Sequence, residues 1–157
     1  MAMNDFSISH GSWKKGALAA VGGVIKYVVV PILIVLGMIT VMERAGVEEL
    51  IESLGLRSLV MQVAILGGVV AALSFFRGFY PKGSLSRMTF GVISMAAAGV
   101  WLWTIVKGGD IALTSGQLDL GVRYTSIVLL LLVAVALRGG YYVAEMLSHR
   151  KEWLDTL

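Results

Sequence analysis

The chain has no cysteine among its 157 residues, which excludes disulfides, thiolate catalysis and cysteine-based metal sites. Charge is also scarce, because Asp, Glu, Lys and Arg make up 15% of the residues against roughly a quarter in soluble domains. Hydrophobic residues reach 57%, and the mean hydropathy is +0.84. A chain of this length and composition is enough for one domain, and it indicates that lipid is the main solvent of that domain.

Four long apolar stretches contain almost no charged residue: 16–42, 59–76, 88–106 and 124–143. Each approaches or exceeds the ~20 residues that a helix needs to cross a ~30 Å hydrocarbon core. Helices are required because lipid offers no hydrogen-bond partner to an open backbone. We therefore predict an all-α membrane protein with four transmembrane helices, in which residues 1–157 form a single integral membrane domain. The first stretch is too long for a signal peptide, and we interpret it as a retained span.

The basic residues predict the orientation of these spans. The net charge is +3, but the 13 basic residues lie mostly beside apolar stretches, where lipid headgroups rather than nucleic acid are the nearer anions. Four spans put both termini and the middle loop on one side, which holds seven basic residues against four on the other. The positive-inside rule predicts cytoplasmic termini, and we expect the plasma membrane.

The two outer connections differ in pattern. In the segment 45–56, four apolar residues recur at helical spacing with three glutamates on the opposite face, which predicts a short amphipathic helix along the outer interface. The segment 107–123 contains Gly108-Gly109, Ser115-Gly116 and two aspartates. These turn signals predict an irregular connection.

Similar motifs recur in the two halves of the chain. Lys15-Gly16 opens the first span and Lys82-Gly83 the third, while Arg77-Gly78 closes the second and Arg138-Gly139 the fourth. This arrangement fits two repeated helical hairpins in parallel orientation. The alternative is that Lys, Arg, Gly and Tyr simply favour helix ends at the cytoplasmic interface.

Ionisable residues within or beside the apolar stretches are functional candidates, because burying one in a bilayer costs several kcal/mol. The intramembrane polar candidates are Lys26, Arg138 and Glu145. The two basic residues have tyrosine neighbours, which are typical of the interface where long basic side chains reach headgroups; the alternative is a buried counter-ion or proton relay. Glu145, seven residues after Arg138 on the same helix face, could pair with it or with a partner subunit, or be solvated just past the span.

A second set of candidates forms a predicted cytoplasmic belt that could bind anionic lipid. Its members are Arg77, Tyr80, Lys82, Arg87, Arg138 and Tyr141. Positive charge near a cytoplasmic leaflet attracts anionic lipid by about 1 kcal/mol per residue. The alternative is that these residues only set the topology.

Small residues form stripes on the second and third spans. They are Ala64, Gly68 and Ala71 on the second, and Gly91, Ser94 and Ala98 on the third. Such stripes let helix backbones approach closely, so we predict that these two spans form the tight centre of a four-helix bundle. Pro31 is the one proline within a span and should bend the first helix.

No motif indicates catalysis or a metal site, so we expect no enzyme, no cofactor and no nucleic-acid partner. The sequence favours a non-catalytic membrane protein that acts through helix association, as a subunit or stabiliser of a larger membrane complex or as a homo-oligomer. Its expected partners are membrane lipids and either other membrane subunits or copies of itself. The alternative is an oligomeric small channel or transporter that uses Lys26, Pro31, Arg138 and the basic loop.

Overall fold

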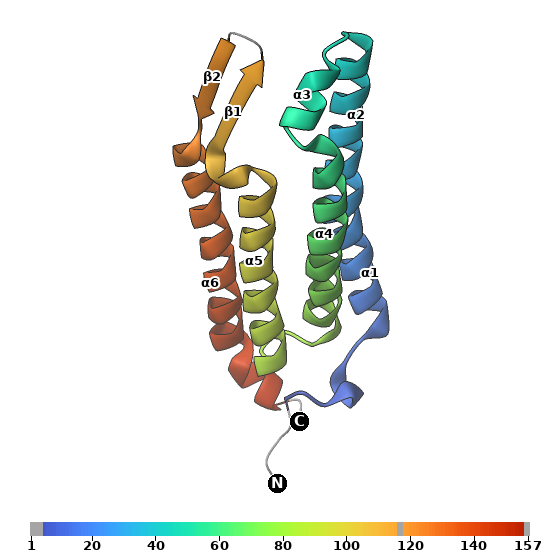
Figure 1. Cartoon of the computed structure of the whole chain (residues 1–157). Helices are drawn as coiled ribbons and strands as arrows, with labels where there is room; N and C mark the ends of the chain where they lie inside the picture. The colour runs from blue at the N-terminus through green and yellow to red at the C-terminus, as the bar shows by residue number, and fades with distance from the viewer. Residues whose placement is uncertain (1–4, 116–117, 156–157) are drawn as a thin grey trace.

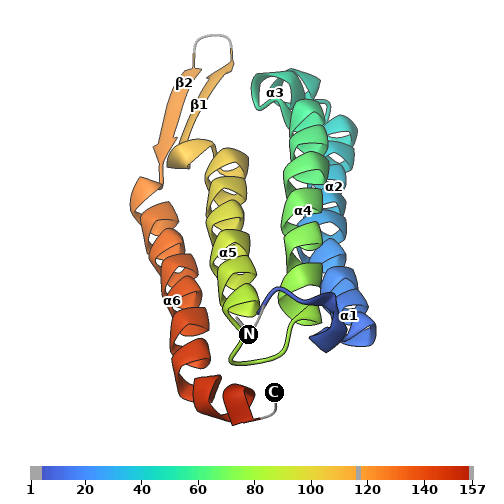
Figure 2. The same ribbon diagram turned by 90° about the horizontal axis from the view of Figure 1, so that it is seen from below.

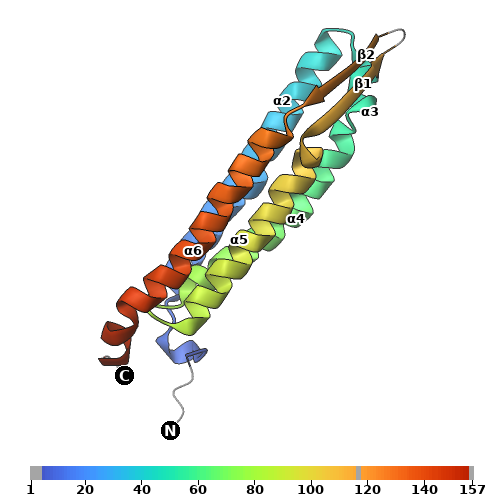
Figure 3. The ribbon, with the colours of Figure 1, turned by 90° about the vertical axis from the view of Figure 1, so that its left-hand side faces the viewer.

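The computed structural model describes residues 5–115 and 118–155 and is mostly helical. Four helical segments are long and apolar enough to cross a membrane: Trp13–Arg44, Glu48–Phe79, Leu85–Ile105 and Thr125–Asp155. Their axes run side by side, and both ends of the described chain lie at the same end of the molecule (Figure 1 and Figure 3). The predicted four long helices are confirmed at this level.

The first segment is a broken helix. A 3₁₀ turn, η1 (Ile8–His10), leads into α1 (Trp13–Val24), the π-helical turn η2 (Ile25–Val29) and α2 (Val30–Arg44). The widened turn lies just before Pro31, and the Val30 N–H reaches back to the Ile25 carbonyl. Proline cannot donate a hydrogen bond to the preceding turn, and a π-helical turn is a common adjustment near such a break.

The predicted amphipathic segment is a helix. α3 (Glu48–Ser53) lies between α2 and α4 (Leu56–Phe79). Ile51 is only 2% exposed and joins a core with Val35 of α2 and Val63 of α4. The apolar side of α3 is therefore buried against its own protein, and the helix caps this end of the helical array.

The connection after α5 (Leu85–Ile105) contains a β-hairpin, so the predicted irregular structure is wrong there. After a 3₁₀ turn, η3 (Lys107–Gly109), strands β1 (Asp110–Ser115) and β2 (Leu118–Arg123) pair antiparallel in register from Asp110↔Arg123 to Ser115↔Leu118. Apolar residues alternate with small or polar ones along both segments, which is the period-two pattern of strands. The prediction of an irregular connection rested on the glycines of this segment, which are also typical of turns.

The helices pack in chain order. α1 packs on α4, α4 on α5, and α5 on α6 (Thr125–Asp155), as Figure 1 and Figure 2 show. In the described part of the chain, α6 forms no comparable contact with α1 or α2. α4 and α5 are the two inner helices of this order, and the array stays open between its first and last helices.

Small residues lie in other interfaces than predicted. Gly23 of α1 packs on the backbone of Ala71, and the Tyr27 carbonyl lies against Gly67, so the small face of α4 meets the first segment. Gly91 of α5 lies under the ring of Tyr142 on α6. The close approaches are therefore α1–α4 and α5–α6. A stripe of small residues shows that some backbone comes near, but it does not say which one.

The remaining residues of the predicted stripes vary in burial. Ser94 and Ala98 are buried, whereas Ala64 and Gly68 are half-buried. Space for an added Cβ at Gly68 is open. α4 and α5 contact each other through stacked aromatic rings, such as Phe76 and Phe90 with centroids 4.9 Å apart.

The motif pairs behind the predicted hairpin repeat lie at different depths. Gly78 lies at the end of α4, beside the Lys15 carbonyl of α1. Gly139 instead packs on Met95, at the middle of α5, and α6 continues to Asp155. Arg138-Gly139 therefore does not close its helix as predicted, and the repeat itself stays a prediction.

Candidate functional site

The end of the array that carries both termini holds a cluster of charged residues, here called the terminal junction: Asp5, Lys82, Arg87, Glu145 and Arg150. Glu145 of α6 is 5% exposed. Arg87 of α5 donates to it twice, from Nε to Oε2 at 2.9 Å and from Nη2 to Oε1 at 3.3 Å. Lys82 adds an ion pair at 3.8 Å. A two-pronged arginine–carboxylate pair is among the stronger polar contacts in proteins, and this one ties α6 to α5.

This pairing corrects the sequence-based interpretation of Glu145. We expected either Arg138, a partner subunit or solvent around this carboxylate, but it is buried against Arg87 and Lys82. Arg138 and Glu145 are seven residues apart on one helix, which is about 10 Å along its axis. Arg87, which is distant in sequence, is closer because α5 packs on α6.

Arg87 also completes the end of α4. Its Nη1 donates to the carbonyl of Arg77 at 3.3 Å and to that of Tyr80 at 3.4 Å. The last carbonyls of a helix have no partner within the helix, so these bonds satisfy groups that would otherwise be orphaned. Most donors of Arg87 are therefore occupied within the protein, and its main role is to join α4, α5 and α6.

Asp5 anchors the N-terminal segment on α5 and α6. Its carboxylate accepts hydrogen bonds from Arg150 Nη1 at 2.6 Å, from Trp153 Nε1 at 3.3 Å and from the Leu85 N–H at 3.3 Å. Its carbonyl accepts from the Ser86 hydroxyl at 2.7 Å. Leu85 begins α5, so the carboxylate also lies at the positive end of a helix dipole.

The surroundings of Asp5 lower its pKa below the ordinary 3.8. Burial acts in the opposite direction and would raise the pKa, but the hydrogen bonds from Arg150, Trp153 and the Leu85 N–H, together with the charge of Arg150, outweigh it. A carboxyl group with a depressed pKa stabilises the fold at any pH above its unfolded value. That stabilisation is lost as the pH falls through the folded pKa.

We predict that the N-terminal segment undocks in acid. The indole N–H resonance of Trp153 should stay constant from neutral pH down to about 4 and then move with a midpoint below 3.8 as Asp5 is protonated. His10 packs edge-on against Trp153, so the measurement uses a His10→Gln background. In Asp5→Asn the acid transition should be absent; a transition that persists there would assign it to another group.

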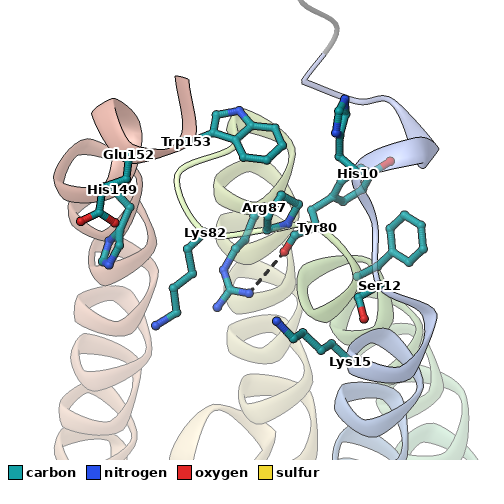
Figure 4. A pocket seen from close by; sticks show the side chains of 11 residues that line it. His10, Ser12, Lys15, Tyr80, Lys82, Arg87, His149, Glu152 and Trp153 are labelled. Carbon is teal, nitrogen blue, oxygen red and sulfur yellow. Dashed lines mark hydrogen bonds between the residues drawn. The ribbon is translucent and has the colours of Figure 1, made fainter. Parts of the chain in front are cut away.

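Beside the terminal junction lies an open cavity of about 640 Å³. Its basic lining consists of His10, Lys15, Lys82, Arg87 and His149, and Glu152 and Trp153 also line it (Figure 4). Figure 4 shows the side chains of Lys15 and Arg87 pointing toward the same space from α1 and α5. Such a lining matches the charge of a phosphate group.

The cavity divides the predicted lipid-binding set. Tyr80, Lys82 and Arg87 line it, whereas Arg77, Arg138 and Tyr141 do not. The guanidinium of Arg77 lies over the ring of Tyr142, 5.6 Å from its centroid. Lys15, His10 and His149, which were not among the predicted residues, also line the cavity.

The two basic residues of the apolar stretches face a separate groove of about 270 Å³, here called the cationic groove. It lies between η2, α5 and α6, and its lining includes Lys26, Tyr27, Ala98, Trp101, Ala134 and Arg138. The sequence placed Arg138 at the depth of the loop with Lys82 and Arg87, and this is wrong. Arg87 meets Glu145, so Arg138 lies about 10 Å further along α6.

Both cations of the groove lie near the middle of the apolar helices. Arg138 precedes Gly139, which packs on Met95 at the centre of α5. Lys26 precedes Tyr27, whose carbonyl lies against Gly67, and Gly67 is midway between Arg57 and Arg77 in α4. Lys26 and Arg138, which the sequence analysis considered as separate candidates, thus line the same groove.

The cationic groove is rich in donors and poor in acceptors. Within the described residues, neither Lys26 nor Arg138 has a carboxylate partner; the Lys26 ammonium lies 5.1 Å from the centroid of the neighbouring Tyr27 ring. The indole N–H of Trp101 is buried without an acceptor. Lys26 and Arg138 are exposed on the open side of the chain, and a buried donor such as the Trp101 N–H is normally paired, so the groove is suited to an acceptor from outside the chain.

No family model, no curated protein and no solved structure matches this chain. The structure itself shows an open array of four helical segments, each long and apolar enough to cross a membrane.

Proposed function

We propose that this chain is an integral membrane protein that acts through helix association, as a subunit or stabiliser of a larger membrane complex. The observation that carries the proposal is the open side between η2 and α6, where the cationic groove presents donors that hydrocarbon tails cannot satisfy. An open array leaves such groups at its surface, within reach of a neighbouring protein. A neighbouring protein that covers this side completes the packing.

Site-specific photocrosslinking in native membranes tests this proposal. A photoreactive residue at Leu131, which lines the cationic groove, should form a defined adduct with another protein. The matched control is Leu137 on the same helix, which is 71% exposed and does not line the cationic groove. Equal adduct formation at the two sites, or none at either, would contradict association through this side.

We predict cytoplasmic termini. This chain has no cysteine, so single introduced cysteines report their own accessibility. Ser9→Cys and Lys151→Cys, exposed at the end with both termini, should resist an impermeant thiol reagent in intact cells. Glu49→Cys and Ser53→Cys, exposed on α3 at the opposite end, should react. The reverse pattern would invert the orientation.

Anionic lipid is the second proposed partner, and the cavity at the terminal junction suits its phosphate. Lys15→Gln/Lys82→Gln should reduce retention of phosphatidylglycerol in native mass spectrometry about tenfold or more, since each lysine near the surface contributes about 1 kcal/mol. Lys14→Gln is the control, because Lys14 is exposed but does not line the cavity. Equal loss in both variants would indicate a general effect of charge rather than a site.

An oligomeric channel or transporter is the alternative proposal, and the deep cations beside the broken first helix favour it. Reconstitution of the purified chain in liposomes separates the two functions. We expect no ion flux above that of empty vesicles. Flux that disappears in Lys26→Met would favour the transporter instead.

A further inference from the structure

We infer that the cationic groove receives the carboxylate of an Asp or Glu in a transmembrane helix of a different protein. This inference rests on the proposed function and specifies the chemistry of the partner. Its basis is the meeting of Lys26, Arg138 and the Trp101 indole in one groove.

Depth favours a partner helix over a lipid headgroup. Tyr27 of η2 lies beside Gly67 at the middle of α4, and Gly139 of α6 lies beside Met95 at the middle of α5, which places the groove within about one turn of the centre of the spans. With a ~30 Å hydrocarbon core and 5.4 Å per turn, the headgroup region is then about 10 Å away. A phospholipid phosphate stays in that region, whereas a side chain on a crossing helix can lie at any depth.

The donors of the groove match a carboxylate. The ammonium, the guanidinium and the indole N–H can each donate but none can accept, and an ionised carboxylate accepts through two oxygens. Two unpaired cations at this depth are costly, and pairing with an acidic residue reduces that cost. Ala98 and Ala134 also line the groove, and small residues allow a helix backbone to come close.

A second copy of this chain does not meet the requirement. The four apolar stretches 16–42, 59–76, 88–106 and 124–143 contain no Asp or Glu. Docking of one copy in the groove of another would bring further cations or no charge to Lys26 and Arg138. The occupant is therefore a different protein, and a homo-oligomer would have to use another face.

The test uses a designed probe, a membrane-spanning Leu/Ala peptide with one central glutamate and a fluorescent label. The full-length protein in phosphatidylcholine vesicles should bind this peptide at least tenfold more tightly than the same peptide with a central glutamine, as measured by energy transfer. Lys26→Met/Arg138→Met should abolish that preference. Lys26→Arg/Arg138→Lys should retain it, because the charges remain. Lys151→Met, which removes an exposed charge outside the four apolar stretches, should leave it unchanged.

Three outcomes overturn the inference. The two peptides bind equally to the parent protein, the preference survives in a methionine double variant that melts like the parent, or phosphatidylglycerol in the vesicles removes the preference and so identifies a lipid as the occupant. Trp101→Phe keeps an aromatic side chain but loses the N–H. It should weaken binding of the glutamate peptide a few-fold, and it replaces the double variant if that variant does not fold. The crosslinking at Leu131 is independent of these results, so association can stand where the carboxylate inference fails.

Discussion

Glu145→Ala is expected to destabilise the protein by about 3–5 kcal/mol, the usual cost of removing one partner from a buried ion pair. The carboxylate is 5% exposed and receives two hydrogen bonds from Arg87. Its loss leaves the guanidinium in the interface between α5 and α6 without a counter-charge. Because the same guanidinium binds the last carbonyls of α4, the substitution should loosen three helices at once.

Thermal unfolding in detergent measures this effect. Glu152→Ala is the control on the same helix, since Glu152 is exposed, and it should melt within about 0.5 kcal/mol of the parent. Replacing both partners, as in Glu145→Met/Arg87→Met, should recover much of the loss, because no unpaired charge then remains. If Glu145→Ala melts like Glu152→Ala, the buried pair does not hold the helices together.

The second large effect is a difference in stability between substitutions at two adjacent glycines. At Gly67 an added Cβ would overlap the backbone carbonyl of Tyr27, which cannot rotate away. Gly67→Ala should therefore cost about 1–3 kcal/mol or more through overpacking. At Gly68 nothing lies within 4 Å of an added Cβ. Gly68→Ala should be neutral or up to about 1 kcal/mol stabilising, because alanine favours the helix.

The same melting assay compares these two variants, and their difference is more informative than either value. The substitutions are chemically identical and one residue apart in α4, so effects of detergent and of helix propensity cancel. Equal melting of Gly67→Ala and Gly68→Ala would show that the first segment does not pack on this face of α4.

The four long helices could be predicted from the sequence because each depends on a local property, an apolar run of sufficient length. The amphipathic helix α3 followed from the spacing of its apolar residues in the same way. The β-hairpin also had a local signal, the alternation in 110–123, but glycine and aspartate residues were given more weight. Local patterns thus predict the helices and strands, except where the alternation of a strand and the glycines of a turn occur in the same segment.

The polar sites could not be predicted, because they depend on which helices touch. Asp5 and Arg150 are 145 positions apart, and no pattern in either neighbourhood indicates the pair. For Glu145 the sequence left Arg138, a partner subunit and solvent open, and its actual partner, Arg87, lies 58 positions away on another helix. Lys26 and Arg138 were identified individually, but their common groove requires α5 between η2 and α6. Sequence patterns identify candidate side chains, and the packing order decides which of them meet.

The central claim, that this chain works as part of a larger membrane assembly, is tested most directly by the mass of the particle extracted from its native membrane in a mild detergent. The account predicts one stable particle that exceeds the 16.8 kDa chain by at least one other membrane protein with an acidic residue in a span. After Lys26→Met/Arg138→Met the mass should fall to that of the chain alone. A single 16.8 kDa chain released from the parent membrane would contradict the account.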